Sequence, residues 1–107
     1  MVVYDLFFGR NIEGRAPVSD VEWAAFVDRV ITPNLPDGFT VFDGYGQWRN
    51  PATGAIVRDP TKILMVAVPS NRGASQAIDA VKKAYEKEFN QQSVGMIVHA
   101  ACAGFAD

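Results

Sequence analysis

Hydrophobic residues follow two spacings along the chain, and these spacings predict six elements of secondary structure. Short runs rich in β-branched and aromatic residues, bounded by Gly, Pro, Asn or Asp, are typical of strands. Runs with apolar residues three and four positions apart are typical of amphipathic helices. The pattern predicts, in chain order, a strand over residues 2–8, a helix over 20–32, strands over 39–49 and 55–68, a helix over 74–89 and a strand over 93–101.

The first predicted helix has the clearest start signal in the chain. Ser19 precedes it and Glu22 follows three residues later, which is the spacing of a capping box. Apolar residues then recur at helical spacing from Trp23 to Ile31. Because Pro33 has no backbone N–H and disfavours helical geometry in the residue before it, we expect this helix to end at residue 32.

The two middle strands carry signals for irregular geometry. Gly44 and Gly46 predict a bulge or a bend in the strand over residues 39–49. Residues 50–54, Asn-Pro-Ala-Thr-Gly, predict the loop of a hairpin. Pro60 predicts a bulge or an edge position in the strand that follows.

The order of the elements favours the α+β class with a ferredoxin-like βαββαβ arrangement. This arrangement is a four-stranded antiparallel sheet with two helices on one face. Hydrophobic residues make up 49% of the chain and charged residues 21%, which is typical of a packed protein. At 107 residues, we expect a single α+β domain over residues 1–107.

The second face of this sheet is expected to be apolar as well. Over residues 63–68 and 93–101, neither of the two alternating sets forms the polar row that a solvated face would show. Such a face is larger than monomers usually leave exposed. We therefore expect a homodimer that packs sheet against sheet as a dimeric α+β barrel. A cavity between the sheet and the loops would then hold a small apolar ligand.

Charge and composition reduce the number of partner and cofactor classes that the chain could bind. The net charge is −2 without a basic stripe, which argues against nucleic acid, and no apolar run reaches the roughly 18 residues of a membrane span. The chain has one cysteine, Cys102, and one histidine, so an internal disulfide and a metal site of several such residues are excluded. We expect no cofactor and no metal; haem bound through His99 is the alternative.

The sequence leaves localisation open. No signal peptide is visible at the N-terminus, which predicts a cytoplasmic protein on the sequence as given. A chain trimmed of its leader would look the same, and the protein would then be exported.

Several motifs together resemble the bacterial family known as domain of unknown function 3574, over nearly the whole chain. The motifs are Asp5-Leu6-Phe7-Phe8-Gly9, Ser19-x-x-Glu22-Trp23-x-x-Phe26, Thr32-Pro33, Pro36-Asp37-Gly38-Phe39-Thr40 and Gly46-Gln47-Trp48-Arg49. Arg58-Asp59-Pro60 matches the family pattern after the hairpin only in part. The resemblance implies the fold class but no activity, cofactor or catalytic residue. Members of the family often look like exported proteins.

His99 and Asp5 are the first candidates for chemistry. Histidine is the side chain that exchanges a proton near neutral pH, so His99 is the natural general base on the non-helical face. Asp5 lies within an apolar strand, where a carboxylate needs a partner. That partner could be His99, Lys62 or an arginine. The alternatives are a histidine packed in an interface and a structural ion pair.

The hairpin carries the densest group of recognition residues. Tyr45 and Trp48 offer aromatic surfaces, and Gln47 and Arg49 supply directed hydrogen-bond donors. We expect Arg58 to face Arg49 across the hairpin, so that two guanidinium groups could converge on an anion. The alternatives are aromatics that cover the core and arginines that are merely solvated.

Two functions are consistent with these features. The preferred one is a small-molecule-binding protein or a cofactor-independent enzyme that transfers a proton on a small apolar or aromatic substrate. In it, His99 or Asp5 would act as base, and Tyr45 or Arg58 would stabilise developing negative charge. The alternative is a non-catalytic protein-interaction module that uses the exposed sheet face or the hairpin, and it predicts no enclosed cavity.

Overall fold

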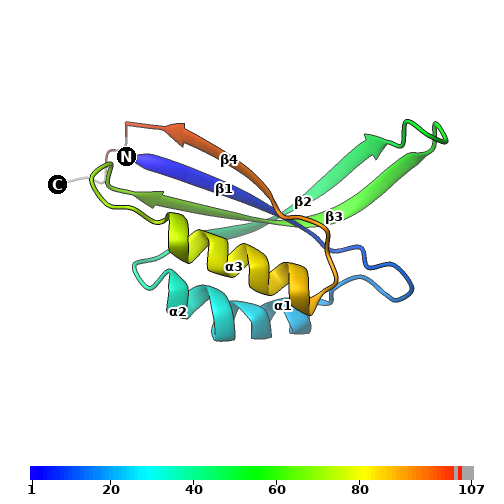
Figure 1. The fold of residues 1–107 in the computed structure, drawn as a ribbon, viewed down its shortest axis with the longest axis horizontal. Coiled ribbons are helices and arrows are strands. Elements are labelled where there is room, and N and C mark those ends of the chain that lie inside the picture. The colour runs from blue at the N-terminus through cyan, green and yellow to red at the C-terminus, as the bar shows by residue number, and fades with distance from the viewer. Residues whose placement is uncertain (103, 105–107) are drawn as a thin grey trace.

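The computed structural model describes residues 1–102 and residue 104, which form one antiparallel sheet with helices on one face (Figure 1). The predicted α+β class is thereby confirmed, and the elements lie within two residues of their predicted bounds. They are β1 (Val2–Gly9), α1 (Asp20–Phe26), a π-helical segment η1 (Val27–Ile31), α2 (Thr32–Asn34), β2 (Thr40–Arg49), β3 (Ile56–Val68), α3 (Ser75–Glu88) and β4 (Gly95–Ala100).

The four strands are ordered β2-β3-β1-β4, and every neighbouring pair is antiparallel. The first and last strands of the chain are therefore neighbours. Asp5 in β1 pairs with Met65 of β3 on one side and with Ile97 of β4 on the other. This register fixes which side chains share a face, because successive residues of a strand point to opposite sides.

The first helical segment begins as predicted and ends later. Ser19 Oγ accepts from the Glu22 N–H at 3.1 Å, and Glu22 Oε1 accepts from the Ser19 N–H at 3.0 Å, which confirms the capping box. The expectation that Pro33 ends the helix at residue 32 is wrong, because helical geometry continues to Asn34. The preceding segment is a π-helix whose last bond runs from the Thr32 N–H to the Val27 carbonyl. Pro33 thus stands in the first turn of α2, where no backbone N–H is needed.

The core lies between the helices and one face of the sheet. Leu6 and Phe8 of β1 are fully buried there, and the Phe8 ring lies 5.1 Å from Trp23 of α1 and 4.8 Å from Tyr85 of α3. The Tyr85 hydroxyl donates to the Gly9 carbonyl at 2.7 Å. Burial raises the pKa of Tyr85, so its hydroxyl stays protonated and keeps this bond to the end of β1.

Beyond the end of β1 the hairpin of β2 and β3 continues alone. β1 ends where Gly9 pairs with Thr61, whereas β2 and β3 stay paired as far as Arg49 and Ile56. Their register runs without interruption, so Gly44, Gly46 and Pro60 introduce no bulge. The hairpin instead bends, and Figure 1 shows it turning away from the helices. We call this two-stranded projection, residues 45–60, the arm.

A close contact at Gly9, next to the bend, predicts an effect on stability. Asp59 Oδ1 accepts from the backbone N–H groups of Arg10 and Asn11, both at 3.1 Å, and a Cβ on Gly9 would collide with this anchored carboxylate. We expect Gly9→Ala to lower the free energy of unfolding by about 1–3 kcal/mol, measured by urea denaturation. Gly73→Ala is the control, because a Cβ there meets open space. An equal effect of both substitutions would contradict the contact.

The capping box predicts a pH dependence of stability. A hydrogen bond from Arg15 and another from the Ser19 backbone lower the pKa of Glu22 to about 2, from an ordinary 4.5. A carboxyl whose pKa is lower in the folded state stabilises the fold above its unfolded pKa and loses this effect as pH falls towards the folded value. Between pH 5 and pH 2.5, we expect the urea midpoint to fall further for the wild type than for Glu22→Gln. Parallel decreases would show that Glu22 is not a source of the pH dependence.

Candidate functional site

Among residues 1–102 and 104, no helix or strand covers the face of the sheet opposite the helices. We call this face the open face. The strand register assigns three residues of each strand to it: Val3, Asp5 and Phe7 of β1, Thr40, Phe42 and Gly44 of β2, Ile63, Met65 and Ala67 of β3, and Gly95, Ile97 and His99 of β4. Large apolar side chains are exposed on it, with Phe42 44%, Met65 38% and Ile97 55% exposed. The titratable side chains of this face are Asp5 and His99.

The structure brings Asp5 and His99 together, as one of the sequence interpretations expected. His99 pairs with Val3 in the backbone register, so its side chain stands diagonally beside Asp5 on the same face. The distance from His99 Nδ1 to Asp5 Oδ2 is 3.9 Å. The Asp5 side chain is 22% exposed and that of His99 is 51% exposed. The pair is therefore accessible from the open face.

This arrangement can support proton transfer. At 3.9 Å the two groups are within range of an ion pair but too far apart for a hydrogen bond. A small side-chain movement would let Asp5 accept from Nδ1–H of His99, which fixes the tautomer and leaves Nε2 free to act as a base. Such catalytic hydrogen bonds are often long without a ligand and shorten when it binds.

Lys62 is not the partner of Asp5, because it lies on the helical side of the sheet. Lys62 Nζ is 2.7 Å from Asp43 Oδ1 and 3.2 Å from Asp20 Oδ1, and Arg10 Nη2 is 3.2 Å from the same Asp20 oxygen. The hydrogen bond to Asp43 raises the pKa of Lys62. This cluster links the bend of the hairpin to the start of α1. Sequence reasoning missed it, because its members lie far apart in the chain.

The arm carries the hairpin candidates, and the strand register divides them between its two faces. Gln47 pairs with Arg58 and Arg49 with Ile56, so the expected opposition of Arg49 and Arg58 is wrong. The two arginines lie on one face of the arm but two positions apart, because the loop sets a different register. Tyr45 lies on the same face of the arm as these arginines and is 95% exposed.

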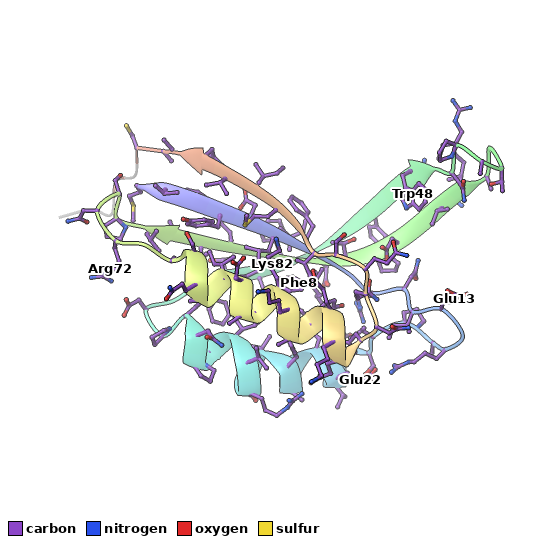
Figure 2. The ribbon with its side chains drawn as sticks, viewed as in Figure 1. Phe8, Glu13, Glu22, Trp48, Arg72 and Lys82 are labelled. Carbon is purple, nitrogen blue, oxygen red and sulfur yellow. The ribbon has the colours of Figure 1, made fainter. Side chains whose placement is uncertain are left out.

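Trp48 lies on the other face of the arm. It pairs with Val57. Trp48 is an even number of residues from Phe42 and Gly44 along β2, so its side chain lies on the same face of the strand as theirs and continues the open face onto the arm. The residue is 52% exposed, and Figure 2 shows it on the projecting hairpin. Within one chain the arm does not approach the Asp5–His99 pair. From Met65, opposite Asp5, to Arg58 is seven residues of strand, or about 23 Å at the rise of roughly 3.3 Å per residue.

A shallow depression of about 140 Å³ lies at the base of the arm. It is lined by Phe7, Gly44, Tyr45, Gly46, Thr61 and Ile63. A Cβ on Gly44 would lie 2.8 Å from Ile63 Cδ1, so the glycine leaves room for the Ile63 side chain. The sequence signal of paired glycines thus corresponds to a close side-chain approach at the bend of the sheet.

The described part of the chain holds no site built for a metal ion. Among residues 1–102 and 104, no three His, Cys, Asp or Glu side chains gather where they could bind one. Within the same residues, no helix is long and apolar enough to cross a membrane.

The fold and the open face define a small α+β protein with one uncovered sheet face. The chain belongs to the family described as a protein of unknown function, DUF3574, whose pattern matches residues 3–105. This match confirms the resemblance that the sequence motifs indicated. A comparison of the sequence with curated proteins finds no match.

Two solved structures share this fold, and both are of a phage SAM lyase. The complex with S-methyl-5'-thioadenosine has a TM-score of 0.63 and 17% identity, covering 92% of this chain and 79% of that one. The apo structure has a TM-score of 0.64 and 17% identity, with 92% and 78% covered. Identity at this level establishes the likeness of fold alone.

Proposed function

We propose that this protein binds a small molecule at the open face and can transfer a proton on it with His99 as base and Asp5 as the group that orients it. The observation that carries this proposal is the placement of the Asp5–His99 pair on a face that is otherwise apolar. A carboxylate at such a position needs a partner, and an adjacent imidazole supplies one. The same pair, once shielded from water, becomes a usable acid–base unit.

The proposal includes a homodimer that covers the open face. The chain exposes 7022 Å² and has a radius of gyration of 15.0 Å, whereas a compact monomer of this length has about 5900 Å² and about 13 Å. The extra area is of the order of the roughly 800 Å² that each partner buries in a standard interface. The strand order β2-β3-β1-β4 supports a ferredoxin-like assignment, and two such sheets packed face to face would form a dimeric α+β barrel.

The chemistry of the open face indicates the kind of ligand. Exposed Phe42, Met65 and Ile97 favour an apolar or aromatic body, and the Asp5–His99 pair favours one polar, proton-bearing group. The phage SAM lyase that shares the fold was solved with S-methyl-5'-thioadenosine, which has an aromatic base and an apolar thioether. This compound is therefore the first one to titrate.

Native mass spectrometry of the purified protein tests this proposal. We expect a dimer, with a retained small molecule or with stoichiometric uptake of added S-methyl-5'-thioadenosine. A bare monomer that takes up no small molecule would contradict the proposal and favour the alternative, a protein-interaction module that uses the exposed sheet face or the hairpin.

Substitutions at the pair test where the small molecule binds. We expect Asp5→Asn and His99→Gln each to weaken binding of the retained or added compound by about tenfold or more, the effect of losing roughly 1.4 kcal/mol. Asp79→Asn is the matched control, because Asp79 is exposed on α3, on the far side of the sheet. Unchanged binding in both pair variants would place the ligand elsewhere.

A further inference from the structure

The residues suited to ligand recognition fall into two groups that one chain cannot bring together. Asp5 lies at the middle of β1 on the open face and His99 lies towards the end away from the arm, whereas Trp48 lies on the arm beyond the other end. About 23 Å of strand separates Asp5 from the arm at the level of Arg58. A small molecule cannot span that distance, so within one copy the two groups cannot form one site.

Beyond its anchored base, the arm lacks the support that stabilises the rest of the sheet. Arg10 and Asn11 bind the base at residues 58–60, but from Ile56 to Val57 β3 pairs with β2 alone, and a two-stranded hairpin without further packing is only marginally stable. Trp48 and Ile56 are nevertheless half exposed, at 52% and 49%. Because the arm turns away from the helices (Figure 1), the face that carries Trp48 is directed to the side on which a covering molecule would sit.

We infer that two copies exchange arms, so that Trp48 of each copy covers the Asp5–His99 pair of the other and completes its binding site. This inference rests on the proposed function, because it assumes the dimer and the site at the pair. The occupant of the open face is a second copy of this chain. Its apolar surface matches the apolar face, and the arms reach across the interface.

The geometry of β3 is compatible with such a two-fold arrangement. The midpoint between Met65, which lies opposite Asp5, and Arg58 on the arm falls at Thr61–Lys62. Phe7 and Ile63 of the open face lie next to this midpoint and line the shallow depression there. A two-fold axis between the facing sheets at this point would set apolar side chains at the centre of the interface, where binding energy is usually concentrated. Each arm would then extend to the opposite end of its partner.

The composite site selects a class of ligand. The indole of Trp48 provides a flat aromatic surface, which favours stacking against a planar ring. His99 and Asp5 of the other copy provide the polar end. We therefore expect a ligand with an aromatic ring between the arm of one copy and the pair of the other, and two such sites per dimer.

Crosslinking between single-cysteine variants tests the exchange of arms. In a Cys102→Ser background, Val57→Cys places a thiol on the Trp48 face of the arm and Ile97→Cys places one beside the pair. Each chain then holds one cysteine, so a product that joins the two variants joins two copies. After the two are refolded together and treated with a short bis-maleimide, we expect a mixed crosslinked dimer. Ile97→Cys mixed with Ala80→Cys, exposed on α3, is the control and is expected to give none.

The outcomes separate this inference from the proposed function. A dimer in which Ile97→Cys crosslinks to itself but not to Val57→Cys overturns the exchange of arms and leaves a face-to-face dimer with its site intact. A protein that remains monomeric overturns both. Efficient crosslinking of Val57→Cys to Ile97→Cys supports the exchange whether or not a ligand is bound.

A second measurement uses the two faces of the arm. Trp48 and Ile56 lie on the same hairpin with similar exposure but on opposite faces. We expect Trp48→Ser to raise the dimer dissociation constant by about tenfold or more and Ile56→Ser to change it less than about twofold, measured by analytical ultracentrifugation. Equal effects of the two substitutions would contradict a specific role for the Trp48 face.

Discussion

The rest of the structure depends on one constraint: the helices cover one face of a sheet that is apolar on both. Leu6 and Phe8 of β1 are fully buried beneath α1 and α3, whereas Phe7 between them points to the open face. The capping box at Ser19 and the aromatic contacts of Tyr85 fix the helices on the first face. Nothing in the described part of the chain performs this task on the second face, so its exposed side chains remain available for a partner or a ligand.

The base of the hairpin is anchored on both sides of the bend. Asp59 binds two backbone N–H groups after the end of β1, and Lys62 joins Asp43 of β2 to Asp20 at the start of α1. These contacts hold the sheet at the point where β1 ends and the arm begins. A charged cluster on the helical side and the Asp59 carboxylate thus anchor the base of the arm to the start of α1 and to the end of β1. Trp48 lies beyond this anchored base, on the face of the arm that continues the open face.

The features predicted correctly from the sequence are those that local interactions determine. The strands, the capping box and the apolar stripe of the first helix depend on residues a few positions apart, so the sequence pattern predicts them well. Pro33 was misjudged because a π-helical turn before it changes the hydrogen-bond pattern, and no sequence signal announced that turn. The opposition of Arg49 and Arg58 was misjudged because a slip in hairpin register changes every cross-strand pair. The Lys62 cluster depends on tertiary contacts, which spacing alone does not show.

The proximity of Asp5 and His99 could be anticipated because this element order can place the first and last strands side by side, but its meaning depends on what covers it. In water, a carboxylate and an imidazole 3.9 Å apart interact weakly, since solvent competes for both groups. An apolar cover removes that water and strengthens the interaction, while the pairing offsets the cost of burying the carboxylate. An apolar face that carries one such pair is thus suited to being covered, and Trp48 with its neighbour Val57 on a second arm would provide an apolar cover. In the proposed dimer, the chemistry of this site would therefore depend on the assembly of the two copies.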